Sequence, residues 1–148
     1  MLSTNINIKK LRSEATIPTY GSEYAAGADL YACVTDSITI EPGTTLLIPT
    51  GIALEIPLGY AGLIYARSGL ASKKGLAPAN KVGVIDADYR GEVMVALHNH
   101  SHLSATIDPN ERIAQLVITP FLTGIFNQVD ELNPTVRGDG GFGSTGSL

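Results

Sequence analysis

The sequence contains little cysteine and little charge. Cys33 is the only cysteine among 148 residues, so no disulfide can form within the chain, and a reducing compartment is indicated. Charged residues make up 16%, compared with about 25% in a typical soluble domain, and the mean hydropathy is +0.15. Such an apolar composition in a chain of one-domain length indicates that subunit contacts cover part of the surface.

Basic residues are also scarce. Ten Lys and Arg oppose fourteen Asp and Glu, for a net charge of −4, which argues against a nucleic acid as partner. No stretch reaches the roughly 20 apolar residues of a membrane span, and the first residues lack the apolar core of a secretion signal. We therefore expect no membrane partner and a cytoplasmic protein, nuclear or organellar if the source is eukaryotic.

Short alternating segments dominate what is present. Apolar residues alternate with polar or small ones at 6–8, 38–40, 52–56 and 93–97, and Gly or Pro recurs every 8–12 residues or so. This pattern predicts half-buried strands of an all-β sandwich or barrel. A short helix is predicted over 68–76, with Ser68 as its N-cap.

Five polar segments interrupt this pattern, and the first two carry Asp29, Arg67 and Ser68. Small residues around Asp29 (AGADLYA) let another group approach its carboxylate, although a solvated Asp in a turn is the simpler interpretation. Arg67 and Ser68 (ARSGLA) stand where a strand meets the helix. Free N–H groups at a helix start and a guanidinium favour an anion site; an ordinary Ser cap with a surface Arg is the alternative.

The third and fourth segments carry Asp86 and Gln115. Two apolar runs flank DADYRG, which predicts a hairpin, and Asp86 follows a strand whose end would partly desolvate it. Asp86 is therefore a candidate general base, with Asp88 as its competitor. Gln115, between Ala and Leu in a strand, is expected to hydrogen-bond the core or reach a ligand.

The fifth segment is the tail. Five of the sixteen glycines lie in RGDGGFGSTG, residues 137–146. It lacks the GK[ST] ending of a Walker loop, yet glycine N–H groups beside Arg137 can wrap a phosphate, and Phe142 can stack on a base. A floppy terminus of no consequence is the alternative. We expect a β domain over 1–134 and a mobile glycine-rich tail over 135–148.

A run of three histidines, His98, His100 and His102, would share one face of an extended chain. This arrangement resembles a metal site, but no carboxylate or cysteine beside it completes a ligand set. We therefore interpret the run as strand-end polarity.

In order and spacing, the five segments resemble the five motifs of the trimeric deoxyuridine triphosphate nucleotidohydrolases (dUTPases), over about residues 6–147. The motif sequences are AGADLYA, ARSGLA, GVIDADYRGEV, ERIAQL and RGDGGFGSTG. The resemblance implies a distorted jelly-roll β barrel with one short helix, assembled as a homotrimer whose chains share each site. It also implies Mg²⁺-dependent hydrolysis of dUTP to dUMP and pyrophosphate, which keeps uracil out of DNA and supplies dUMP for thymidylate synthesis.

The resemblance also implies a role for each motif residue. Asp86 would deprotonate the water that attacks the α-phosphorus, and Asp29 would hold Mg²⁺ through water. The nucleoside would contact Asn80, Gly83, Val84 and Tyr89, with Phe142 over the uracil. The triphosphate would contact Arg67, Ser68, Gly69, Gln115, Arg137, Gly143 and Ser144.

Two alternatives to this activity stay open. A deoxycytidine triphosphate deaminase shares the scaffold but requires a glutamate in the base pocket and a different third motif. The second alternative is a trimer that binds nucleotide without catalysis and regulates a partner.

Overall fold

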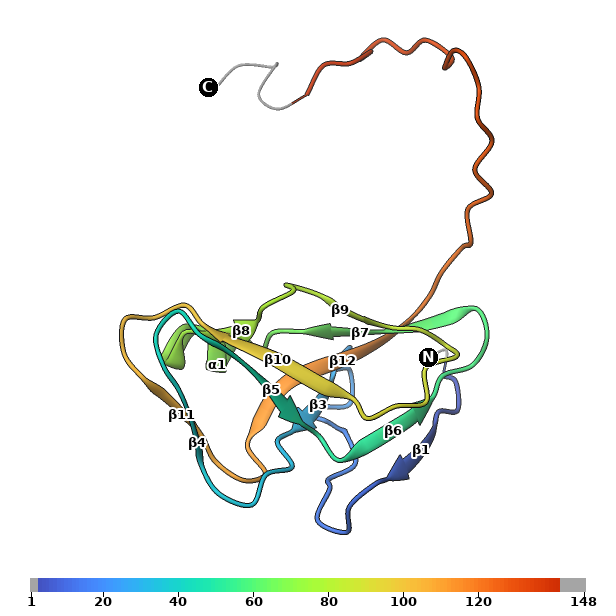
Figure 1. Ribbon diagram of the computed structural model, residues 1–148. Helices are drawn as coiled ribbons and strands as arrows, with labels where there is room; N and C mark the ends of the chain where they lie inside the picture. The colour runs from blue at the N-terminus through green and yellow to red at the C-terminus, as the bar shows by residue number, and fades with distance from the viewer. Residues whose placement is uncertain (1–2, 142–148) are drawn as a thin grey trace.

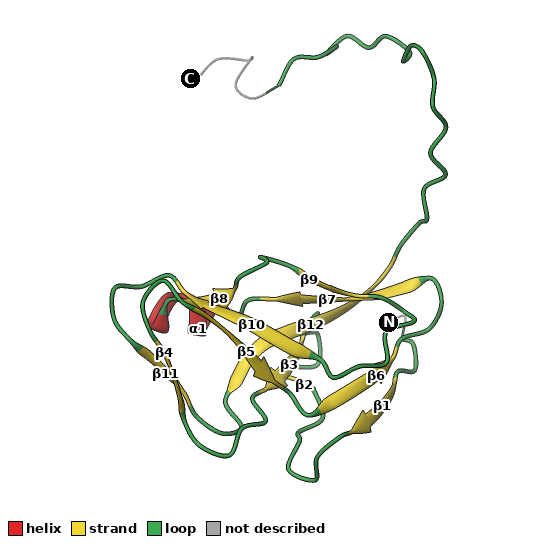
Figure 2. Ribbon diagram, in the orientation of Figure 1, coloured by secondary structure: helices red, strands yellow, loops and turns green. Residues whose placement is uncertain are grey.

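A computed structural model describes residues 3–141, which form twelve short strands and one helix (Figures 1 and 2). The helix is α1 (Ser68–Lys74). The strands are β1 (Asn7–Lys10), β2 (Thr19–Tyr20), β3 (Ala28–Tyr31), β4 (Ile38–Ile40), β5 (Thr45–Pro49), β6 (Ile52–Glu55), β7 (Tyr60–Tyr65), β8 (Leu76–Pro78), β9 (Gly83–Ile85), β10 (Met94–Asn99), β11 (Ala105–Ile107) and β12 (Arg112–Pro120).

The largest sheet has five antiparallel strands in the order β2-β3-β12-β7-β9. The nine-residue strand β12 lies at its centre, and a bulge shifts its register on β3 between Arg112 and Ala114. Gln115 pairs with Asp29 on one side and with Tyr65 on the other. This register brings the first and fourth motifs side by side.

Three smaller sheets complete the β domain. Their strand orders are β5-β10-β8, β1-β6 and β11-β4, and every pair is antiparallel. One apolar core joins the sheets. Its largest fully buried apolar side chains are Leu30, Ile40, Ile48, Ile52, Ile56, Leu76, Leu97, Ile107, Ile113, Val93 and Val95.

The four alternating segments form strands as predicted, but the pairing of the third motif is different. We expected a hairpin between the apolar runs on either side of residues 86–91. Instead β9 pairs with β7, whereas β10 pairs with β5 and β8. Gly83 favours the close approach of β9 to β7, because a Cβ there would lie 3.3 Å from the Ile64 Cβ, a tight contact.

The predicted helix exists but differs at both ends. Arg67, in extended conformation, is the N-cap, and among the described residues no side chain caps the helix. The prediction of Ser68 as the cap is therefore wrong, because helical residues begin at Ser68 itself. The helix ends at Lys74, since Gly75 adopts a left-handed conformation with φ of 67° and its N–H bonds the Ala71 carbonyl.

The last strand, β12, ends at Pro120, and residues 121–141 run away from the sheets (Figure 1). Several apolar side chains here face solvent; Leu122 is 97% exposed and Phe126 is 98% exposed. Across the described residues, no helix is both long and apolar enough to cross a membrane.

Candidate active site

Three polar side chains from the first, second and fourth motifs meet where β3 and β12 lie beside the end of β7 in the large sheet. Asp29 lies on β3, Arg67 lies between β7 and α1, and Gln115 lies on β12. The Arg67 Nε donates to Asp29 Oδ1 at 2.7 Å. The structure therefore brings together residues from three motifs that lie up to 86 positions apart in the sequence.

Asp29 is buried, with 8% of the residue exposed, and is held by two arginines. Besides Arg67, the Arg112 Nη1 lies 3.4 Å from Asp29 Oδ2. A solvated carboxylate in a turn is thus excluded. Each carboxylate oxygen has a second lone pair, so Asp29 can still accept a hydrogen bond from water on a metal ion. Arg112 had no role in the sequence prediction, although it lies within ERIAQL.

Gln115 uses one amide hydrogen inside the protein. Its Nε2 donates to the Ala66 carbonyl at 2.8 Å, which leaves a second N–H for another acceptor. Gly27 lies directly against this side chain, because a Cβ on Gly27 would collide with Gln115 Oε1 and lie 3.1 Å from Gln115 Cδ. The glycine of the first motif therefore makes room for the glutamine of the fourth.

Ser68 and Gly69 are exposed in the first turn of α1. A Cβ on Gly69 would meet no described atom within 4 Å, so the space in front of this turn is open. The interpretation as an ordinary Ser cap with a surface Arg is wrong, because Ser68 lies inside the helix and Arg67 is bonded to Asp29. Unpaired N–H groups of a first turn beside a guanidinium are suited to an anion.

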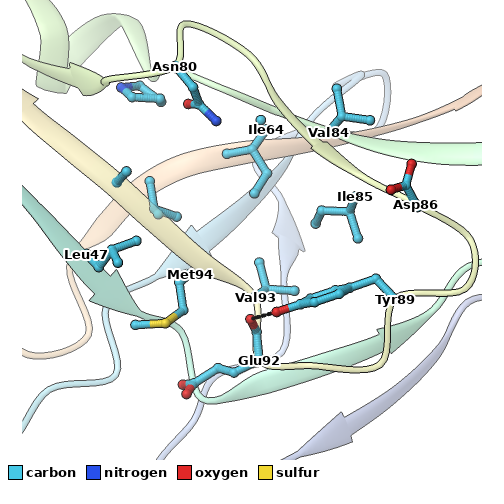
Figure 3. A pocket seen from close by; sticks show the side chains of 14 residues that line it. Leu47, Ile64, Asn80, Val84, Ile85, Asp86, Tyr89, Glu92, Val93 and Met94 are labelled. Carbon is cyan, nitrogen blue, oxygen red and sulfur yellow. Dashed lines mark hydrogen bonds between the residues drawn. The ribbon is translucent and has the colours of Figure 1, made fainter.

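The third motif lines a cavity of about 360 Å³ between β9 and β10 (Figure 3). Its walls include four of the predicted nucleoside residues and the candidate base: Asn80, Gly83, Val84, Tyr89 and Asp86. Apolar side chains such as Leu47, Ile64 and Met94 form most of the remaining wall. This mixture of apolar walls and few polar groups is typical of a small-molecule site.

Asp86 follows β9 directly and lies on the rim of the cavity (Figure 3). The expectation that the strand end would partly desolvate it is wrong for the single chain, where Asp86 is exposed. The residue comes directly after the last residue of β9, Ile85. Its backbone carbonyl accepts the Tyr89 N–H at 3.1 Å in a turn. Asp88 is exposed too and does not line the cavity.

Tyr89 is 45% exposed, and its hydroxyl donates to the Glu92 carbonyl at 2.9 Å (Figure 3). Glu92 also lines the cavity, and the sequence prediction did not include it. Its carboxylate accepts from Arg12, 80 positions earlier in the chain. No local sequence pattern predicts an ion pair between residues so far apart in the chain.

Within the described residues, the cavity and the cluster around Asp29 remain separate. The cavity lining contains none of these predicted metal and phosphate residues, namely Asp29, Arg67, Ser68, Gly69 and Gln115. Arg137 lies on the extended segment and donates from its Nε to the Gly140 carbonyl at 2.8 Å. The remaining predicted tail residues, Phe142, Gly143 and Ser144, lie outside the described residues.

The histidine run has no metal geometry in the part of the chain that the structure describes, where no group of three or more His, Cys, Asp or Glu is placed to hold an ion. The His98 and His100 rings are in edge contact, with centroids 4.5 Å apart. Partial desolvation, then the charges of Lys81 and His98, lower the pKa of His100 below its usual range.

Comparisons with known proteins identify the family of this chain. A family model described as dUTPase matches residues 13–146. Deoxyuridine 5'-triphosphate nucleotidohydrolases from Syntrophotalea carbinolica and Desulfitobacterium hafniense are 47% and 48% identical, each over 99% of both chains. A point mutant of the Staphylococcus bacteriophage 80alpha dUTPase with dUpNHpp superposes with a TM-score of 0.88 at 30% identity, over 98% of this chain and 100% of that one. The predicted all-β jelly-roll class with one short helix is confirmed, and the chain belongs to the dUTPase family.

Proposed function

We propose that this chain hydrolyses dUTP to dUMP and pyrophosphate by attack of water on the α-phosphorus. The observation that carries the proposal is family membership over nearly the whole chain, together with the match of all five motifs. The reaction keeps uracil out of DNA and provides dUMP for thymidylate synthesis. The bacterial relatives and the buried free thiol of Cys33 support a reducing cytoplasm as the location.

The triphosphate contacts the cluster around Asp29 in this proposal. Arg67 and the first turn of α1, at Ser68 and Gly69, supply positive charge and N–H donors, and Gln115 supplies its second amide hydrogen. Positioning and charge neutralisation account for most catalysis of phosphoryl transfer. The tail from Arg137, with Gly143 and Ser144, adds donors to the β and γ phosphates as a lid, residues 135–148, over the β domain, residues 1–134.

Mg²⁺ suits this cluster because the ion usually keeps several waters while it binds phosphates, and it needs few protein ligands. Asp29 is a single buried carboxylate with lone pairs to spare, so it would hold the ion through water. When bound, the ion neutralises phosphate charge. A dUTPase from phage phi11 of S. aureus, 26% identical, is described with a structural Mg(II) ion.

The nucleoside occupies the cavity in this proposal. Asn80 and the backbone of Gly83 and Val84 read the uracil edge, where the close backbone excludes a thymine methyl. A cytosine edge would leave donors facing donors, which a buried site penalises strongly. Tyr89 lies under the deoxyribose and excludes a 2′-hydroxyl, while Phe142 covers the base. Asp86, on the rim, removes the proton from the attacking water.

A homotrimer with shared sites is part of the proposal. The cavity with Asp86 and the cluster with Asp29 are separate in one chain, so a second copy is needed to join them. Exposed apolar side chains beside the cavity, including Leu47 and Val84 at 64% each, support an interface there. The solvent-facing Leu122 and Phe126 support a further contact made by residues 121–136.

The decisive experiment measures pyrophosphate release from dUTP, dCTP, dTTP and UTP, each with and without Mg²⁺. We expect release from dUTP alone, and only with the metal. Ammonia release from dCTP would instead establish the deaminase, against which DADYRG and the complete glycine tail argue. Nucleotide binding without pyrophosphate or ammonia release would favour the non-catalytic regulatory trimer.

A further inference from the structure

The Glu92 carboxylate joins three segments behind the nucleoside cavity. Its Oε1 accepts from the Arg12 Nη2 at 2.5 Å and from the Gly51 N–H at 2.8 Å. Arg12 in turn donates from Nη1 to the Cys33 carbonyl at 3.0 Å. Glu92 thus ties the end of the third motif to the turn after β5 and to the segment after β1.

The anchor at Gly51 is rigid. Gly51 has φ of 69°, and a Cβ there would lie 2.7 Å from both Ala15 Cβ and Cys33 Sγ. Both neighbours are buried, so the backbone around Gly51 has little space in which to move. A side chain bonded to this N–H is therefore fixed relative to the core.

The main chain of Glu92 holds the Tyr89 ring. The Tyr89 hydroxyl donates to the Glu92 carbonyl (Figure 3), and the ring lies on Gly91, where a Cβ would come within 2.6 Å of Tyr89 Cζ. These two contacts hold the ring against residues 91 and 92, while 45% of Tyr89 stays exposed. Because the Glu92 side chain is anchored, the backbone that supports the ring is anchored as well.

Global stability alone does not explain this arrangement. The side chains of Arg12 and Glu92 are 37% and 23% exposed, and ion pairs with such access to solvent contribute little to unfolding free energy. Tyr89 and Glu92 both line the cavity, so the bonds of Glu92 lie beside the nucleoside site.

We propose that Arg12 and Glu92 are a positioning pair that holds Tyr89 against the nucleoside cavity and thereby sharpens discrimination of 2′-deoxyribose from ribose. The proposal rests on the proposed function, in which Tyr89 lies under the sugar. A ring that tilts away by a fraction of an ångström would open space for a 2′-hydroxyl, so loss of the pair relaxes sugar selectivity before it affects the chemical step.

Two variants and a matched control test the pair. R12M keeps the aliphatic stem and removes the guanidinium, while E92A removes both bonds to Oε1. The control is K74M, which breaks the Lys74–Glu111 pair at 2.6 Å. That pair has nearly the same exposure, 35% and 23%, and neither residue lines the cavity. The control therefore reports what loss of an equivalent ion pair does elsewhere.

The measurements are kcat and KM for dUTP and UTP, dissociation constants for dUMP and UMP by calorimetry, and melting temperature. We expect R12M and E92A to lower the dUTP/UTP ratio of kcat/KM about tenfold, with the change mainly in KM rather than in kcat. A tenfold change in this ratio corresponds to about 1.4 kcal/mol. K74M is expected to keep the wild-type ratio. Equal ratios in R12M, E92A and K74M would overturn the proposal.

Further variants keep the test decisive if E92A does not fold. E92Q retains an oxygen for Gly51 and Arg12, so it is expected to keep most of the selectivity; damage equal to that of R12M would contradict the role of this acceptor. Y89F removes the hydroxyl bond to Glu92. Selectivity losses of R12M and Y89F should not add in the double variant, because both act through one ring position, and full additivity would refute that link.

Failure of the positioning pair is distinguishable from failure of the proposed function. If the wild-type chain releases no pyrophosphate from dUTP, the proposed function fails. The binding ratio of dUMP to UMP still tests the pair, since it requires no turnover.

Discussion

The guanidinium of Arg67 donates from Nε to Oδ1 of Asp29 at 2.7 Å, which joins the second motif to the first. Removing the Asp29 charge should affect both the metal and the arginine. We expect D29N to lower kcat/KM for dUTP at least about 100-fold, with weaker dependence on Mg²⁺ concentration, because this site acts through positioned charge. Pyrophosphate release across a Mg²⁺ titration measures both effects.

The control for this variant is D88N, which removes an exposed carboxylate outside the cavity and the cluster. Wild-type turnover in D29N would show that Asp29 has only a structural role.

Asp86 is the residue on which the chemical step depends in our proposal. D86N keeps the size of the side chain but cannot accept the proton of water. We expect kcat to fall by about 10³-fold, within the usual range for a general base, while dUMP binding changes little. Single-turnover hydrolysis and calorimetry separate the two quantities. If hydrolysis persists near the wild-type rate, another group is the base.

The sequence predicted the strands better than their partners. In β10, Val95 and Leu97 are buried while Met94 is exposed, so alternation of hydrophobicity marked the strand correctly. The pairing of β9 with β7 instead brings Gly83 opposite Ile64, a contact between segments about 20 positions apart in the sequence. Local periodicity contains no information about such a contact, and for that reason the predicted hairpin was wrong.

The same distinction applies to the site. The motifs identified Asp29, Arg67 and Gln115 by residue type, and the antiparallel register of β3, β12 and β7 brought them together. The bonds of Glu92 to Arg12 and Gly51 were not predicted, because they join residues 80 and 41 positions apart. The exposure of Asp86 was not predicted, because the burial of a residue at a strand end depends on which other segments pack around that end.

Gly27 offers a test of the contact between the first and fourth motifs. A Cβ in G27A would collide with Gln115 Oε1, so the Gln115 side chain must shift, which strains its bond to the Ala66 carbonyl. We expect a stability loss of about 1 kcal/mol and roughly tenfold lower kcat/KM. G21A is the matched control, because a Cβ on Gly21 meets no described atom within 4 Å. Equal behaviour of the two variants would contradict the contact.

Truncation after residue 136 tests the tail as a lid. The removed residues contribute no strand or helix to the described part of the fold, so the melting temperature and the oligomeric state should stay unchanged. Turnover of dUTP should be lost, because Arg137 and the glycine-rich segment are proposed to close over the phosphates. Light scattering and pyrophosphate release measure the two properties. Dissociation of the oligomer on truncation would contradict the lid.

His100 predicts a specific pH dependence of stability. Desolvation first, then Lys81 and His98, lower its pKa from 6.5 in the unfolded chain, so the unfolded state binds the proton more tightly. The contribution of His100 is therefore complete above pH 6.5 and is lost as the pH falls below that value. We expect H100Q to show a smaller drop in melting temperature between pH 7.5 and pH 5 than the wild-type chain. H102Q is the control, and an identical acid limb in H100Q and the wild-type chain would rule out this origin.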